Sequence, residues 1–191
     1  MADIYKDRIV CTETIGYSMK KIISNILYRI KEDSLSKRRE AGERQAVYKE
    51  LKSIKSALVL WSVCDRQTAW LKELAVKFKE VKFDKLCYMP VKEETSAPAD
   101  ALVLRNEDLG FGGKITHEDL PAILAKRYDL LIDFSTEENK ILNYVLLKSK
   151  AMCKVGMRHE GGKYDLIIEG VAEPLAFIDR LKEVLSEIKE Y

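Results

Sequence analysis

The sequence is poor in glycine, proline and long apolar runs, and each shortage excludes a class of protein. Nine glycines and four prolines in 191 residues leave no long tract with the composition of disordered or low-complexity segments. No run approaches the roughly 20 apolar residues that a membrane-spanning helix needs. Residues 1–18 also lack the apolar core of a signal peptide. We therefore expect a globular, cytoplasmic protein.

Cysteine and histidine are also scarce, which argues against a disulfide framework and a metal centre. The four cysteines are Cys11, Cys64, Cys87 and Cys153. No two of them form a CxxC pair, and three lie in or beside apolar runs, where cysteine is usually a small core residue. Because only His117 and His159 could join them, we expect no metal site. No motif for a cofactor occurs, so we expect none.

Charged residues, in contrast, are abundant and unevenly placed. They make up 34% of the chain, although the formal net charge is only +2. Residues 20–55 contain eleven Lys or Arg and five Asp or Glu, a balance of +6, so the remainder carries −4. The positive excess therefore belongs to the N-terminal segment.

The apolar pattern of this basic segment predicts helices. Apolar residues recur at three- and four-residue spacing over residues 19–30, and a second, weaker helical pattern covers residues 35–54. The pattern changes abruptly after this point. We therefore assign residues 1–55 to a basic helical extension and residues 56–191 to an α/β domain.

Within residues 56–191, continuous apolar runs alternate with helical patterns. Such runs are typical of strands that are buried on both faces. The predicted strands are 57–63, 85–89, 101–104, 128–134, 153–157 and 164–168. The predicted helices are 68–79, 117–126, one after Ser135 and one opened by Pro174. We expect Ser135 to cap its helix, with Glu138 completing a capping box.

This alternation indicates a three-layer, doubly wound, Rossmann-like α/β fold with a mostly parallel sheet. The last two predicted strands, 153–157 and 164–168, are separated by a short glycine-containing segment. A gap this short favours a β-hairpin. We therefore expect a C-terminal antiparallel hairpin at one edge of the sheet.

Two parts of the chain resemble known families. Residues 126–157, KRYDLLIDFSTEENKILNYVLLKSKAMCKVGM, resemble the N-terminal half of lipopolysaccharide heptosyltransferases. The matching residues are Tyr128, Asp129, Ile132, Asp133, Ser149, Lys150, Ala151, Val155 and Gly156. Residues 35–188 as a whole look like a family of small bacterial proteins of unknown function, which shares the segment 149–156. That second resemblance implies a fold and no activity.

The resemblance to the heptosyltransferases implies a Rossmann-like domain that holds a sugar acceptor. It also places a catalytic base near Asp65, in a loop that lacks the glycine of the enzymes. Their second domain, which binds the nucleotide-sugar donor, has no counterpart before the chain ends at Tyr191. An enzyme of this kind would therefore need a partner chain to bind the donor.

Ligands of open α/β sheets bind beyond the carboxyl ends of the strands, near helix N-termini. The loops 64–68, 134–138 and 157–159 should meet there and offer carboxylate, hydroxyl and cationic groups. The candidate ligand-binding residues are Asp65, Arg66, Thr68, Ser135, Thr136 and Arg158. A structural interpretation competes with this one, because Asp65 and Ser135 are also good helix caps.

Residues 20–55 allow three interpretations. The positive charge would suit RNA or DNA phosphates, and the apolar stripe would suit an anionic membrane surface. We favour the third, in which the stripe packs on the domain and the charges face water, because acidic residues are interleaved and no aromatic platform accompanies them.

Two functional hypotheses follow. The first is a non-catalytic or uncharacterised domain that acts by binding, as a homodimer in one version. The second is an enzyme related to nucleotide-sugar glycosyl transfer, with Asp65 as its base.

Overall fold

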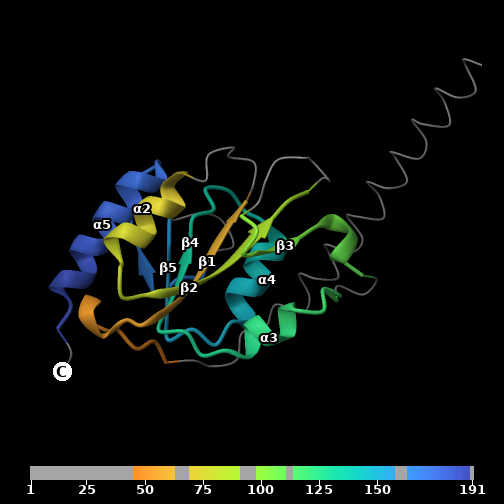
Figure 1. The fold of residues 1–191 in the computed structure, drawn as a ribbon, viewed down its shortest axis with the longest axis horizontal. Coiled ribbons are helices and arrows are strands. Elements are labelled where there is room, and N and C mark those ends of the chain that lie inside the picture. Colours follow the sequence, from red (N-terminus) through yellow and green to blue (C-terminus); the bar gives the residue numbers. More distant parts are fainter. Residues whose placement is uncertain (1–44, 63–68, 91–97, 111–113, 158–162, 190–191) are drawn as a thin grey trace, which may run out of the picture.

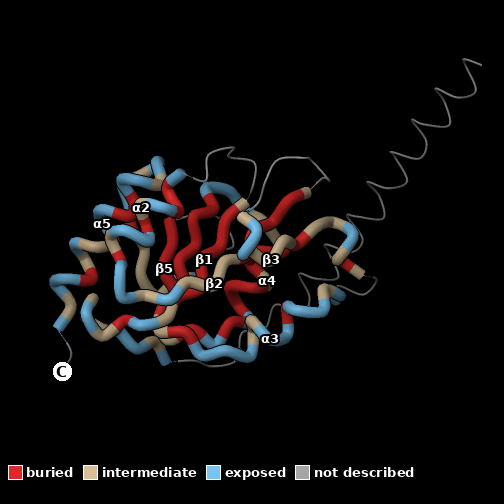
Figure 2. The backbone as a smooth tube through the Cα atoms, viewed as in Figure 1, coloured by how far each residue is buried: buried red, intermediate tan, exposed pale blue. Residues whose placement is uncertain are grey.

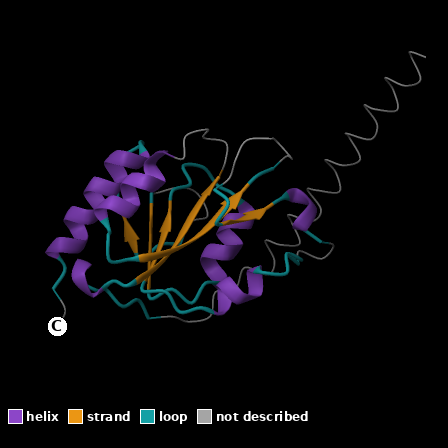
Figure 3. Ribbon diagram, viewed as in Figure 1, coloured by secondary structure: helices purple, strands orange, loops and turns teal. Residues whose placement is uncertain are grey.

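The structure, a computed structural model, describes residues 45–62, 69–90, 98–110, 114–157 and 163–189. Its strands are β1 (Ser56–Ser62), β2 (Lys82–Tyr88), β3 (Ala101–Leu104), β4 (Leu130–Asp133), β5 (Cys153–Gly156) and β6 (Leu166–Ile167). Its helices are α2 (Ala69–Lys77), α3 (Leu120–Ala125), α4 (Lys140–Lys148) and α5 (Pro174–Glu187), with 3₁₀ turns η1 (Leu51–Ser53) and η2 (Asn106–Asp108). Figure 3 shows these elements by type.

The strands form one six-stranded sheet in the order β3-β2-β1-β4-β5-β6 (Figure 1). Every neighbouring pair is parallel. This is the strand order of the doubly wound dinucleotide-binding folds. The predicted Rossmann-like α/β class is confirmed.

The predicted antiparallel hairpin is wrong, because β6 runs parallel to β5, with Val155 opposite Leu166 and Gly156 opposite Ile167. The apolar runs in the sequence overestimate the length of both strands. Their paired parts end at Gly156 and begin at Leu166, so residues 157–165 connect them. The amide of Asp165 donates to the carbonyl of Lys154, so the chain already lies alongside β5 when β6 begins, whereas a hairpin needs only a tight turn.

Helices cover both faces of the sheet and bury two separate cores. One core packs beneath α2 and α5 and includes Val59, Ile132 and Phe177. The other lies between the sheet and α3 and α4 and includes Leu60 and Leu131. Successive strand residues point to opposite faces, so β1 and β4 contribute to both cores and are buried along their length (Figure 2).

The described end of the predicted extension is not an α-helix. Residues 45–50 have no regular secondary structure, and only the single turn η1 follows before β1. The amide of Val47 donates to the carbonyl of Met152, and Ile54 is buried in the α2/α5 core. Contacts with the domain therefore override the weak helical pattern over residues 45–54, the described part of the predicted helix 35–54. Residues 1–44 lie outside the described residues. They include eight of the eleven Lys and Arg residues of the basic segment 20–55.

Two helices begin at residues other than those that the sequence predicts. Asn139, and not Ser135, caps α4, because its side chain accepts hydrogen bonds from the amides of Ile141 and Leu142. Helix α3 begins at Leu120 and not at residue 117. The amide and hydroxyl of Thr116 donate to the carbonyl of Asp108, which holds that segment in a turn. Pro174 opens α5 as predicted.

Two further expectations concern the described residues. Cys87 and Cys153 are buried free thiols, as expected of core cysteines, and burial raises the pKa of the Cys87 thiol to about 11. Cys11 and Cys64 lie outside the described part of the chain. None of the described helices has both the length and the apolar character needed to cross a membrane.

Candidate functional site

The order of the strands places a crevice between β1 and β4. From β1 the chain winds outward to β2 and β3, then returns to the other side of β1 as β4 and continues to β5 and β6. In such sheets ligands bind beyond the carboxyl ends of the two strands at which the direction of winding reverses. The carboxyl ends of β1 and β4 are therefore the first place to look for a site.

A pocket of about 210 Å³ lies at this position. Its lining residues come from five elements or loops that are distant in sequence: the end of β1, the start of α2, the end of β2, the loop between β4 and α4, and the start of α5. They are Trp61, Ser62, Trp70, Tyr88, Phe134, Ser135, Thr136, Glu137, Glu138, Asn139 and Pro174. We call this the switch-point pocket.

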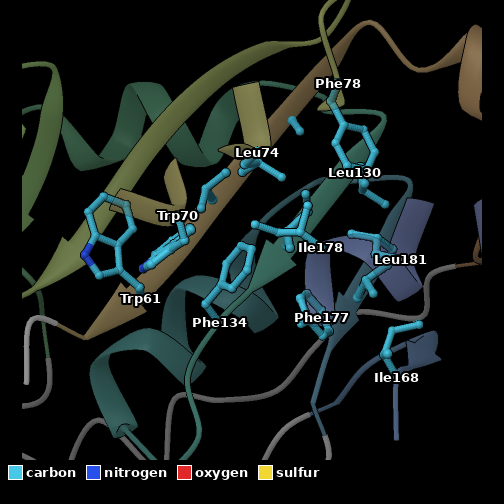
Figure 4. Close-up of a cluster of buried hydrophobic side chains, with 14 of the residues drawn as sticks. Trp61, Trp70, Leu74, Phe78, Leu130, Phe134, Ile168, Phe177, Ile178 and Leu181 are labelled. Carbon is cyan, nitrogen blue, oxygen red and sulfur yellow. The ribbon is translucent and has the colours of Figure 1, made fainter. Parts of the chain in front are cut away.

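Three aromatic residues of the pocket lining, Trp61, Trp70 and Phe134, belong to the buried cluster that Figure 4 shows. The ring centroids of Trp61 and Trp70 are 5.9 Å apart, with an interplanar angle of 89°. Trp70 and Phe134 lie 4.1 Å apart, and Phe134 meets Phe177 edge-on at 5.1 Å. These rings are buried in the α2/α5 core. The wall is therefore anchored in the core, and its shape does not depend on exposed side chains.

Two buried polar atoms of the pocket lining have no hydrogen-bond partner within the described part of the chain. They are the Oγ of Ser135 and the Nε1 of Trp61, and the two residues are only 5% and 3% exposed. A buried donor without a partner costs about 1–3 kcal/mol, and such groups in folded proteins usually have an explanation. Both atoms belong to residues that line the same pocket, although the atoms themselves are closed to solvent.

The loop that carries Ser135 is held by a buried carboxylate. Oδ1 of Asp133 accepts a hydrogen bond of 2.9 Å from the amide of Ser135. Oδ2 of Asp133 accepts one of 2.9 Å from the hydroxyl of Tyr164. Burial, together with the charge of Asp133, raises the pKa of Tyr164 far above its usual value, so this hydroxyl keeps its proton.

Tyr164 reaches Asp133 by crossing directly over Gly156. A Cβ atom at position 156 would lie 2.4 Å from the ring of Tyr164, a separation that no side chain can tolerate. Gly156 therefore allows the ring to lie flat against β5. Tyr164, which precedes β6, thus holds Asp133 at the end of β4, and Asp133 in turn holds the pocket loop.

The rim of the switch-point pocket is acidic among the described residues. Thr136, Glu137 and Glu138 are exposed and follow Ser135 directly. Asn139 closes the rim, with its side chain engaged as the cap of α4. The pocket thus has an aromatic wall, two unpartnered donors and carboxylates at its mouth.

Of the six predicted ligand-binding residues, Ser135 and Thr136 line this pocket together. The predictions for Asp65, Arg66, Thr68 and Arg158 lie outside the described residues. Sequence reasoning missed Trp61 and Trp70, because both fall in apolar patterns that indicate core. The signal that could have found them is their position on either side of the loop after β1.

The amino end of the sheet holds a different kind of polar cluster. The carboxylate of Asp129 accepts hydrogen bonds from Nζ of Lys49 (2.7 Å), from the amides of Lys55 (2.9 Å) and Ser56 (3.0 Å), and from the hydroxyl of Ser56 (3.1 Å). Partial burial opposes ionisation, but these donors outweigh it and lower the pKa of Asp129. Asp129 therefore fastens residues 49–56 to the start of β4.

A second carboxylate at this end is equally occupied. Asp84 accepts hydrogen bonds of 2.6 Å from both Nζ of Lys126 and the hydroxyl of Tyr128. Tyr128 and Asp129, which carry part of the resemblance to the heptosyltransferases, thus have structural roles here. Ser149 is also structural, since its hydroxyl accepts from the amide of Ala151.

A larger cavity, of about 560 Å³, lies near this amino end, between η1, the end of α2 and α5. It is lined by Lys52, Lys77, Lys79 and Lys182 among others. None of its described lining residues contains a buried polar atom without a partner. We therefore place the candidate site in the smaller switch-point pocket, where unpartnered groups and fold topology coincide.

Comparison with known proteins gives a family without an activity. Residues 24–188 match a family of unknown function (DUF6913). No curated protein and no solved structure matches the chain. The expected likeness to a family of unknown function is confirmed, and no homologue supports the resemblance to the heptosyltransferases.

Proposed function

Because the chain belongs to a family of unknown function (DUF6913), we propose its function from the site alone: the domain binds a small molecule in the switch-point pocket. The observation that carries this proposal is the coincidence of Ser135 Oγ and Trp61 Nε1, both buried and unpartnered, in one pocket at the topological switch point. A ligand whose binding opens these atoms to its own hydrogen-bond acceptors would remove both penalties.

The fold supports a preformed site. Ser135 is fixed through its amide by Asp133, and Asp133 is fixed by Tyr164. Trp61 and Trp70 pack against each other and into the core. A site whose groups are already in place loses little conformational entropy when a ligand binds.

The chain offers a built-in reporter for this proposal. Trp61 and Trp70 both line the pocket, and they are the only two tryptophans in the sequence. Occupancy of the pocket should therefore change the intrinsic tryptophan fluorescence. Binding elsewhere, for example to the basic residues 20–44, should change thermal stability without this optical signal.

The test is a screen of the full chain by thermal shift and tryptophan fluorescence together. The panel contains nucleobases, nucleosides, nucleotides, nucleotide sugars, monosaccharides and amino acids. We expect at least one compound to change both signals with the same midpoint. At a concentration of 100 Kd it should stabilise the fold by about 2.7 kcal/mol, a rise in Tm of roughly 5–10 °C.

Two serine variants locate the binding. Ser135→Ala removes the unpartnered hydroxyl and should weaken binding, whereas Ser149→Ala removes a buried, partnered hydroxyl at the far end of α4 and should leave affinity unchanged. Binding that Ser135→Ala does not affect, or a panel in which no compound changes the fluorescence, would contradict the proposal. Binding of a nucleotide sugar that is lost in Asp65→Ala would instead support glycosyl transfer.

A further inference from the structure

The larger cavity near the amino end of the sheet is a groove with a partly apolar lining. It measures about 560 Å³, and its apolar residues are Leu51, Val76, Phe78 and Val81. Phe78 is buried, and Leu51 and Val81 are half-buried. Val76, on α2, is 56% exposed, the highest fraction among the described large apolar side chains. A ligand that covers these residues would remove apolar surface from water, which favours binding.

The polar residues of this groove are mostly lysines, so we call it the lysine groove. They are Lys52, Lys77, Lys79, Lys182, Glu50, Glu80 and Ser186. Both carboxylates already have a cationic partner. Nζ of Lys55 donates to Glu80 over 2.5 Å, and Nζ of Lys52 lies 3.1 Å from the carboxylate of Glu50. These pairs neutralise the two negative charges of the lining.

Two lysines of the lysine groove have no partner for their charge. The ammonium of Lys77 pairs with the carboxylate of Asp179. Those of Lys79 and Lys182 form no ion pair and no hydrogen bond with any residue that the structure describes. Lys79 follows α2 and Lys182 lies on α5, so the free charges come from both helical segments that border the groove. Unpaired positive charge beside apolar surface suits a ligand that is both anionic and apolar.

The ends of the two helices oppose an anion only weakly. Lys77 is the last residue of α2, and Ser186 lies in the last turn of α5, so two helix C-termini border the groove. A helix C-terminus carries roughly half a negative charge, and its effect falls off within the last turn. The ammonium groups of Lys79 and Lys182 carry a full positive charge each. The lysines therefore decide the sign of the groove.

We propose that the lysine groove binds a small carboxylate with an aliphatic tail, which covers Leu51, Val76 and Val81 while the carboxylate pairs with Lys79 and Lys182. The volume of the groove lies within the range of about 300–1,000 Å³ that is usual for small-molecule sites. An inorganic anion would use only the charges, and an uncharged hydrocarbon only the apolar lining. This site is separate from the switch-point pocket and does not rest on the proposed function.

The experiment titrates the full chain by isothermal calorimetry with hexanoate, octanoate and decanoate, at concentrations too low for micelles. The affinity should rise about two- to fourfold with each added methylene group, because the tail covers more of the apolar lining. Octanamide keeps the tail and lacks the charge, so it should bind several-fold more weakly than octanoate. Inorganic phosphate has charge and no tail, and it should bind more weakly than octanoate as well.

Variants then test the two parts of the groove separately. Lys79→Gln combined with Lys182→Gln should weaken octanoate about three- to tenfold, as expected for two solvent-exposed ion pairs, and should leave octanamide unchanged. Lys72→Gln, at an exposed lysine of α2 outside the lining, is the matched control. Val76→Ser should weaken octanoate and octanamide alike. Its control is Leu175→Ser, at an exposed leucine outside the lining.

Tryptophan fluorescence separates this inference from the proposed function, because both tryptophans line the switch-point pocket and neither lines the lysine groove. Octanoate should therefore bind without changing the fluorescence. If octanoate and octanamide bind equally, if the double lysine variant binds octanoate as wild type does, or if no carboxylate binds, the inference is wrong and the proposed function is unaffected. A fluorescence change with the same midpoint as the calorimetric titration would place the carboxylate in the switch-point pocket. That result would support the proposed function and overturn this inference.

Discussion

The two ends of the sheet differ in how completely their polar groups are hydrogen-bonded. At the amino end, Asp84 accepts two hydrogen bonds and Asp129 accepts four, at distances of 2.6–3.1 Å. At the carboxyl end, Asp133 is also hydrogen-bonded, but Ser135 Oγ and Trp61 Nε1 have no partner among the described residues. Saturated groups stabilise a fold, whereas unsatisfied ones destabilise it unless something else occupies them. The comparison thus assigns stability to the amino end, and it agrees with the proposal that binding takes place at the carboxyl end.

The largest effect is expected from breaking the amino end. Asp129→Ala leaves the ammonium of Lys49 and the amides of Lys55 and Ser56 without their acceptor. We expect a loss of about 3 kcal/mol in the free energy of unfolding, measured by urea denaturation. Glu118→Ala, at an exposed carboxylate, is the control and should be close to wild type. Equal effects of the two variants would show that Asp129 does not fasten the segment.

The next effect concerns the support of the carboxyl end. Gly156→Ala places a Cβ atom 2.4 Å from the ring of Tyr164 and should cost about 2 kcal/mol through overpacking. The same substitution in a Tyr164→Ala background meets no ring, so its cost should shrink markedly. A double-mutant cycle by urea denaturation measures this coupling. An unchanged cost in both backgrounds would contradict the close approach.

A matched pair of serines compares the two kinds of polar group directly. Ser149→Ala removes an acceptor for the amide of Ala151 and should destabilise the fold by about 1 kcal/mol. Ser135→Ala removes a buried hydroxyl without a partner, so stability should stay within about 0.5 kcal/mol of wild type or rise. If Ser135→Ala destabilises as much as Ser149→Ala, its hydroxyl has a structural partner and the comparison breaks.

The smallest effect is a difference in pH dependence. The pKa values of Asp84 and Asp129 are lowered by their donors from the ordinary value of 3.8. As the pH falls, the unfolded chain therefore binds protons before the folded chain does. The contribution of these two carboxylates to the free energy of unfolding is complete well above pH 3.8, and it is lost as the pH falls toward their lowered pKa values. Asp129→Asn should flatten the acid limb of the stability curve. An acid limb identical to wild type would refute this assignment.

Much of the fold follows from local pattern. The buried runs at 57–63 and 128–134 predict β1 and β4 to within two residues at each end, because the central strands of a parallel sheet are apolar on both faces. The direction of β6 could not be predicted. The direction of β6 depends on its two-residue pairing with β5 and on the position of Tyr164 over Gly156. Local periodicity encodes neither of these contacts.

The candidate site was predictable in position and less so in composition. Ser135 and Thr136 follow a buried strand, and the doubly wound topology brings that strand end to the crevice. The role of Ser135 as a cap was wrong, because Asp133 occupies its amide and the chain continues to Asn139 before α4 begins. The apolar patterns around Trp61 and Trp70 indicate core, and both residues do belong to the core. Both also line the pocket, which the pattern does not reveal.

The crossing of Tyr164 over Gly156 also has a consequence for the evolution of the family. Any side chain at position 156 takes the space that the ring needs, and without the ring Asp133 loses the hydroxyl that it binds. Changes at positions 133, 156 and 164 should therefore occur together among family members. Relatives that keep glycine at 156 should keep an aromatic residue at 164, and those that lose one should have lost the other.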